Sequence, residues 1–163
     1  MSIISYIHYY ILASKQAPKV DKQFLNWHQV KQCAIIMYDY QLAEIADFVA
    51  SCHNADKIID VYIIYDGKPE QAPKPAFNHK ILSKKDFSVF QIPKDTLVAK
   101  LHKTDILINL GNKQQLKSHA LSKLIPATCK ISSYEDVIFD VSLTNTSNFL
   151  KEVFTYLNMI KNK

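Results

Sequence analysis

The chain is poor in glycine: only Gly67 and Gly111 occur among its 163 residues. The phosphate-binding P-loop, the G-x-G-x-x-G fingerprint and the G-x-S-x-G nucleophile elbow each need glycines at short fixed spacing, which two distant glycines cannot supply. No glycine lies between Tyr38 and Glu44, where the first turn of a dinucleotide-binding fold would approach the pyrophosphate. We therefore expect no NAD, FAD or ATP held by these loops, and no cofactor.

Arginine is absent, since all 20 basic side chains are lysines. A lysine ammonium does not reproduce the planar arginine fork that contacts phosphate and guanine through two hydrogen bonds, so a sequence-reading DNA-binding protein is not expected. The net charge is +5, and Lys84 and Lys85 form the only adjacent lysine pair. We expect a solvated lysine surface and no nucleic-acid partner, although non-specific attraction of lysines to phosphate stays open.

The cysteines Cys33, Cys52 and Cys129 are odd in number and far apart, without a C-x-x-C pair, so neither a disulfide framework nor a structural zinc site is expected. No apolar run approaches the roughly 18 residues of a membrane-spanning helix, and no signal-peptide pattern opens the chain. We therefore expect a cytoplasmic protein without a membrane partner. The histidines are scattered singly and predict no metal site: His8, His28, His53, His79, His102 and His119.

Residues 1–17 are expected to form a separate N-terminal segment, an amphipathic helix over 2–16 that Ser2 can cap. A helix lying on a membrane surface would carry several lysines on its polar face, and here the first basic residue is Lys15. We expect the helix to pack on its own domain, on a second copy in a homo-oligomer, or on a protein partner. Its apolar stripe consists of Ile3, Ile4, Ile7, Tyr10 and Ile11, and its interface candidates are Tyr6, Tyr9 and Tyr10.

Residues 18–163 alternate between strands and helices, as in a single α/β domain. The run over 33–38 is apolar throughout, which is typical of a parallel strand covered on both faces. We predict a three-layer, Rossmann-like domain with a mostly parallel sheet of five or six strands. The expected strands are 33–38, 58–65, 105–110, 128–131 and 137–143, the expected helices are 41–53, 94–102, 113–124 and 147–161, and 80–82 and 87–90 are either short strands or irregular.

Polar side chains follow several of the expected strands. In open α/β sheets ligands bind outside the carboxyl ends of the strands, so these side chains form a candidate ligand-binding rim. Asp and Asn also finish strands because they favour turns and caps, which requires no ligand. We assign no catalytic residue, because no nucleophile has a base at a suitable spacing. The rim consists of Asp39, Asp66, Asn109, Gly111, Ser132 and Tyr134.

Several hydrophobic motifs match a known family: Ile35–Asp39, Asp105–Leu110, Cys129–Ile131, Val137–Asp140 and Phe154–Ile160. Through them the chain resembles a bacterial family of small uncharacterised proteins, over about residues 20–161. That family has no established activity, so the resemblance implies no catalytic residue. More distantly, Asp105 to Ile131 is similar to the N-terminal half of heptosyltransferase-like glycosyltransferases, which bind their sugar donor largely with a second Rossmann domain. This chain has no room for one, which implies a relative that binds or scaffolds without catalysis.

Three functions follow from these observations. The leading hypothesis is a non-catalytic cytoplasmic α/β protein that associates with a partner or with itself through the tyrosine-rich N-terminal helix or the lysine surface. The second is a small-molecule binder or enzyme that uses the rim. The third is an RNA- or ribosome-associated protein held by lysines. The missing catalytic motifs favour the first, and whether the protein is an enzyme is left open.

Overall fold

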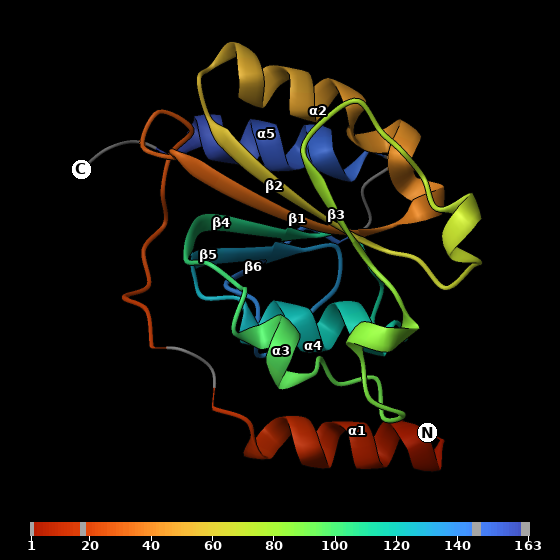
Figure 1. Cartoon of the computed structure of the whole chain (residues 1–163). Helices are drawn as coiled ribbons and strands as arrows, with labels where there is room; N and C mark the ends of the chain where they lie inside the picture. The colour runs from red at the N-terminus through yellow and green to blue at the C-terminus, as the bar shows by residue number, and fades with distance from the viewer. Residues whose placement is uncertain (1, 17–18, 145–147, 161–163) are drawn as a thin grey trace.

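Six parallel strands form one sheet in the order β3-β2-β1-β4-β5-β6 (Figure 1). The structure is a computed structural model that describes residues 2–16, 19–144 and 148–160. This strand order is the one found in the doubly wound dinucleotide-binding folds. The prediction of a Rossmann-like α/β domain with five or six strands is therefore confirmed. The strands are β1 (Gln32–Tyr38), β2 (Ile58–Ile64), β3 (His79–Leu82), β4 (Thr104–Asn109), β5 (Ala127–Ser132) and β6 (Val141–Ser142).

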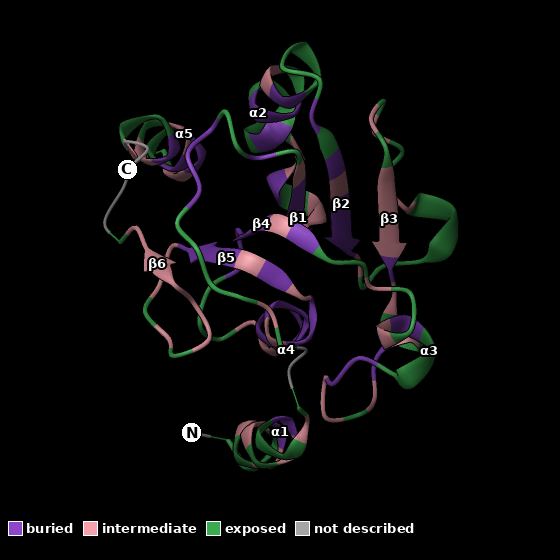
Figure 2. Ribbon diagram, turned by 90° about the vertical axis from the view of Figure 1, so that its left-hand side faces the viewer, coloured by how far each residue is buried: buried purple, intermediate pink, exposed green. Residues whose placement is uncertain are grey.

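Helices cover both faces of the sheet, and one further helix lies outside them. Figure 1 shows α2 (Leu42–Asn54) and α5 (Phe149–Met159) on one face and α3 (Asp95–Val98) and α4 (Leu116–Leu124) on the other. The expected N-terminal helix is present as α1 (Ile3–Ser14), which packs on the outer side of α4 (Figure 2). Residues 1 and 17 of the expected N-terminal segment, and residue 18 at the expected start of the α/β domain, lie outside the described residues, as do residues 147 and 161 of the last expected helix. The short 3-10 helices are η1 (Asp39–Gln41), η2 (Pro69–Gln71) and η3 (Lys84–Asp86).

Side chains of β1 alternate between two hydrophobic cores. Ile35 and Met37 belong to the core under α2 and α5, while Ile36 belongs to the core under α3 and α4, and all three are fully buried. Burying one such side chain contributes about 1.5–3 kcal/mol. The continuous apolar run of this strand therefore follows from its central place in a parallel sheet with both faces covered.

Two expected elements are shorter than predicted because local polar contacts end them. The helix expected over 94–102 stops at Val98, after which the chain tightens into i→i−3 hydrogen bonds before β4 begins. The strand expected over 137–143 is only Val141–Ser142, because the Asp136 carboxylate accepts the backbone N–H of Ile138 and holds a turn.

One further expectation differs in the same way, and two open alternatives are decided. The helix expected from residue 113 begins at Leu116, since the side chains of Asn112 and Gln115 bond to the backbone of the preceding turn. Of the two alternatives left open for 87–90, the structure shows the irregular one, in which Phe87 forms an isolated bridge with Pro93. The short strand considered at 80–82 is real and pairs with β2 as β3.

Replacing Gln91 by glycine is expected to stabilise the fold. Gln91 has φ of 62°, in the left-handed region, where a Cβ atom costs about 1–2 kcal/mol. Glycine removes that strain but adds roughly 0.5–1 kcal/mol of unfolded-state entropy, so the net gain should be about 0.5–1 kcal/mol in chemical denaturation. Gln91→Ala keeps the Cβ atom and should give no gain; an equal gain for both variants would contradict this explanation.

Candidate functional site

The carboxyl ends of β1 and β4 mark the point where the chain winds in opposite directions. The helix after β1 covers one face of the sheet and the helix after β4 covers the other (Figure 1). Ligands of doubly wound proteins bind in the crevice at this point. All six predicted rim residues lie at or just beyond the carboxyl ends of β1, β2, β4 and β5, which are neighbouring strands.

Four of the rim residues form one hydrogen-bonded network. The amide nitrogen of Asn109 donates to the Tyr134 hydroxyl at 3.2 Å, and its oxygen accepts the backbone N–H of Gly111 at 2.8 Å. The Ser132 hydroxyl donates to the carbonyl of Tyr134, whose own backbone N–H bonds back to that hydroxyl at 3.2 Å. Asn109 and Ser132 are fully buried, and burial is the main reason that the pKa of Tyr134 is raised well above its ordinary value.

The other two rim residues lie apart from this network. Asp66 is half-exposed and its carboxylate pairs with the buried ammonium of Lys117 on α4. That ammonium also lies 5.4 Å from the centre of the Phe87 ring. Asp39 is half-buried and begins the 3-10 helix η1. The rim is thus an assembly of local pairs rather than one convergent set of groups.

Side chains of the chain itself cross the crevice between the loops after β1 and β4. The Gln41 amide donates to the carbonyl of Leu110 at 2.8 Å, and the Gln115 amide donates to the Tyr40 hydroxyl at 2.6 Å. Burial raises the pKa of Tyr38, at the end of β1, to about 12. The crevice therefore holds neutral hydroxyls and amides bonded to each other, with no activated nucleophile among these groups.

A second polar cluster, which the sequence analysis missed, lies between α1 and α4. His8 and His119 are both buried, and their ring centres are 6.0 Å apart. His8 Nδ1 donates to the carbonyl of Phe90 at 2.8 Å. His119 Nε2 lies 3.3 Å from a carboxylate oxygen of Asp136, a contact without hydrogen-bond geometry that becomes an ion pair only when the imidazole is protonated, and Tyr9 packs against the His119 ring. Single histidines on two distant helices give no spacing from which this pair could be found.

The buried imidazoles predict that stability falls as the pH is lowered. Burial is the largest cause lowering the pKa of His8 and of His119; for His119 the Asp136 carboxylate opposes this effect, while His8 and Lys123 add to it. Near the ordinary histidine pKa of 6.5 the folded chain therefore binds fewer protons than the unfolded chain. Stability should be full above that value and decline below it, toward the lower folded-state pKa values. The melting temperature, followed by circular dichroism, should fall between about pH 7.5 and about pH 5.

Two variants separate this effect from general acid denaturation. His8→Leu removes one buried imidazole and should flatten the decline, whereas His53→Gln changes an exposed histidine and should leave it unchanged. Identical pH profiles for the wild type and His8→Leu would contradict a role for the histidine pair.

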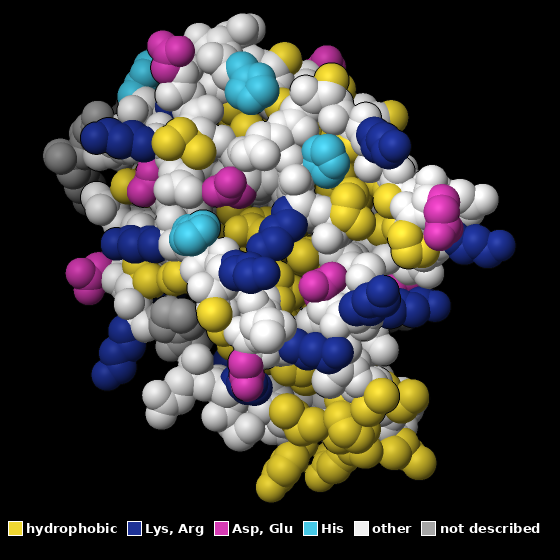
Figure 3. All heavy atoms as spheres, in the orientation of Figure 1, with side chains coloured by type: hydrophobic (Ala, Val, Ile, Leu, Met, Phe, Trp, Pro, Cys, Tyr) yellow, Lys and Arg dark blue, Asp and Glu magenta, His cyan; other side chains and the backbone are white. Residues whose placement is uncertain are grey.

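The outer face of α1 is apolar and exposed. Ile3, Tyr6 and Tyr10 are 79%, 69% and 75% exposed, and Ile4 is half-exposed. Figure 3 shows hydrophobic side chains gathered over this helix, at the lower edge of the view. Of the three tyrosines predicted as interface residues, Tyr6 and Tyr10 lie on this face, while Tyr9 contacts the histidine pair. We call Ile3, Ile4, Tyr6 and Tyr10 the outer face of α1.

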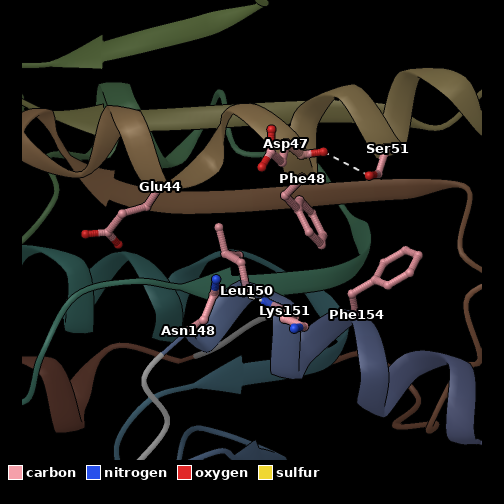
Figure 4. Close-up of a pocket in the computed structure, with 8 residues that line it drawn as sticks. All are labelled: Glu44, Asp47, Phe48, Ser51, Asn148, Leu150, Lys151 and Phe154. Atoms are coloured by element: carbon pink, nitrogen blue, oxygen red, sulfur yellow. Dashed lines mark hydrogen bonds between the residues drawn. The ribbon is translucent and has the colours of Figure 1, made fainter.

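A shallow groove separates α2 from α5 (Figure 4). Its floor is formed by Phe48, Leu150 and Phe154, with carboxylates from α2 along one wall. The hydroxyl of Ser51 donates to the carbonyl of Asp47 one helical turn earlier, at 2.8 Å, so it is not held by a base. The groove is therefore the boundary between two packed helices, and the residues that line it do not form a catalytic site.

The fold and the rim define a Rossmann-like α/β protein without the glycine-rich phosphate loop. A model described as a family of unknown function, DUF6913, matches residues 5–160, so the chain belongs to that family. None of the curated proteins and none of the solved structures matches the chain. Among the described residues no three or more His, Cys, Asp or Glu side chains are grouped to hold a metal ion. Over the same residues no helix has the length and apolar character needed to cross a membrane.

Proposed function

We propose that the protein is a non-catalytic α/β protein that associates with a second copy of itself through the outer face of α1. The observation that carries this proposal is an exposed apolar face on a helix without a single charged residue. Contiguous exposed apolar patches of several hundred Å² on soluble domains generally mark interaction surfaces.

The size of the outer face supports a protein contact. Tyr6 and Tyr10 together expose on the order of 300 Å². With Ile3 and Ile4 added, the face supplies a large part of the roughly 800 Å² that each partner contributes to a standard interface. Tyrosine is also enriched in interfaces, because its ring is apolar and its hydroxyl can stay in contact with water.

The helix dipole favours an antiparallel copy as the partner. The first turn of α1 has no acidic residue and its last turn has no basic one, so its side chains do not offset the dipole. His8 contacts His119 and Leu12 accepts a hydrogen bond from Lys123, so α4 runs parallel to α1 and its own dipole does not offset that of α1. The Lys123 ammonium compensates the carboxyl end of α1 alone, and no acidic residue of its own compensates its first turn. In a dimer whose two-fold axis is perpendicular to α1, the two α1 helices would run antiparallel, with each end beside the opposite pole of the other helix.

Other observations agree with this proposal. Rim residues around Asn109 bond to each other, and other side chains bridge the crevice beside them, which favours association over the predicted alternative of a small-molecule site or enzyme at the rim. Cys33, Cys52 and Cys129 are all free and buried, which fits the reducing cytoplasm that we propose as the compartment. The distant similarity to heptosyltransferase-like enzymes stays a prediction.

The test is the mass of the full chain in solution. Light scattering over a range of concentrations should show twice the 18.7 kDa of one chain, and Ile3→Lys combined with Tyr10→Lys should return the mass to that of one chain. Val89→Lys is the matched control, because Val89 is as exposed as Ile3, at 79%, but lies outside α1. A monomer at every concentration would overturn the proposal, as would binding of α1 to anionic lipid vesicles by a protein that stays monomeric.

A further inference from the structure

Lysines converge on one cavity at the opposite end of α4 from the rim. The cavity has a volume of about 340 Å³ and lies between the segment after α1, the last turn of α4, the start of β5 and the loop before β6. Its polar lining is four lysines and one carboxylate: Lys19, Lys22, Lys123, Lys130 and Asp140. These four lysines come from three separate segments of the sequence, so the expectation of a solvated lysine surface did not include this cluster.

Lys130 is the buried member of the cluster. It lies within β5, pairs across the sheet with Leu107, and is only 6% exposed. Its ammonium donates to the carbonyls of Ser122 and Lys123 at the end of α4, which fixes its position at the cavity wall. An ammonium has three donors, so these two bonds leave one for another acceptor.

The cavity carries more positive charge than its one carboxylate can neutralise. Asp140 pairs with Lys22 at 2.8 Å, and the same carboxylate oxygen accepts the backbone N–H of Lys130. Lys123 donates to a backbone carbonyl at the end of α1. Burial, followed by repulsion from Lys22, lowers the pKa of Lys130 to about 8. Lysine ammonium groups that are held close together repel each other, and a bound anion reduces that repulsion.

We propose that this cavity binds the phosphate group of a small molecule. Four lysines exceed the single carboxylate by three positive charges, of which a doubly charged anion neutralises two. Lysine binds phosphate as a point charge where no arginine is available. The cavity is near the lower limit of small-molecule sites, roughly 300–1,000 Å³. Val20, Val137 and Ile138 line the rest of it, so an apolar group beside the phosphate has a surface to contact. The proposal does not depend on self-association through α1.

The test is a titration of the full chain with inorganic phosphate and with phenyl phosphate, followed by nuclear magnetic resonance. We expect the backbone signals of Val20, Ala127 and Ile138 to shift saturably, and the pKa of Lys130 to rise toward its ordinary value. Tighter binding of phenyl phosphate would identify the ligand as a phosphate ester with an apolar group, and equal binding would identify free phosphate.

Three variants test whether the phosphate binds in this cavity. Lys130→Met should weaken binding about tenfold or more, which corresponds to the loss of one charge-assisted contact. Lys19→Gln, on an exposed residue whose change should leave the fold intact, should weaken binding several-fold, and the exposed Lys85→Gln control should not change it. The absence of saturable shifts with either phosphate would overturn the proposal. So would equal losses in Lys19→Gln and Lys85→Gln, or binding of single-stranded RNA alone.

Discussion

Lys57→Met is expected to lower the free energy of unfolding by about 3 kcal/mol, the largest effect predicted for this chain. The Lys57 ammonium is almost fully buried and donates to the carbonyls of Trp27 and Val30, both at 2.7 Å. It also lies 4.4 Å from the centre of the Trp27 ring. Methionine keeps an unbranched apolar side chain as far as Cε but lacks the ammonium, so two buried carbonyl oxygens lose their donor, and each costs roughly 1–3 kcal/mol. Urea denaturation of both proteins measures the difference.

Lys31→Met is the matched control for that measurement. Lys31 lies on the same side of the fold, directly before β1, but it is exposed. Its replacement removes the same charge and should change stability by less than about 0.5 kcal/mol. If the two variants lost equal stability, net charge rather than the buried contacts would be the cause.

Gly111→Ala is expected to destabilise the protein by about 2 kcal/mol because the rim has no room for a methyl group. A Cβ atom at this position would lie 2.2 Å from Ser118 Oγ, 2.9 Å from Ser118 Cβ and 3.0 Å from Asn109 Oδ1. Ser118 is fully buried and its hydroxyl donates to the carbonyl of Gln115 at 2.9 Å, so it cannot turn away freely. Gly111 does not have a positive φ, and its role is therefore to permit this close approach.

Gly67→Ala is the control, because its added Cβ atom would overlap a side chain that is free to move. Its Cβ atom would also lie 2.2 Å from a side-chain oxygen, that of Tyr65. That hydroxyl is the far end of a half-buried side chain that can rotate, so we expect a loss below about 1 kcal/mol. The double variant Gly111→Ala, Ser118→Gly should recover part of the stability lost by Gly111→Ala. Equal losses at the two glycines, without recovery, would show that packing around Ser118 is not the cause.

The sequence predicted the fold because its strands are buried on both faces. The sequence around Ile35 and Ile108 is continuously apolar, and the helices between the strands have apolar residues at three- and four-residue spacing. Both the class of fold and the place of the rim could therefore be predicted. Element ends were less predictable, because single side chains such as Asp136 and Asn112 end a strand or delay a helix through bonds to nearby backbone. The position of those side chains depends on tertiary packing rather than on hydrophobic periodicity.

The polar interior was not predictable from residue types alone. Lysine is mostly exposed in proteins, so a solvated surface was the expectation, yet Lys57, Lys117 and Lys130 are buried. Each is held by acceptors that are distant in sequence or that follow from the fold: carbonyls near β1, the Asp66 carboxylate, and the end of α4. For Lys130 a signal was present, since it is a charged residue in the middle of an apolar strand.

The place of α1 determines which shortened forms of the protein are informative. Helix α4 has the sheet on one side and α1 on the other, and His119 and Ala120 on it are buried. Deleting α1 would expose these residues together with Ile92, and would create a surface prone to aggregation at a place that is buried in the intact protein. The mass of such a fragment would then reflect aggregation through the newly exposed side of α4. Only point changes on the outward side of α1 can show whether that side joins two molecules.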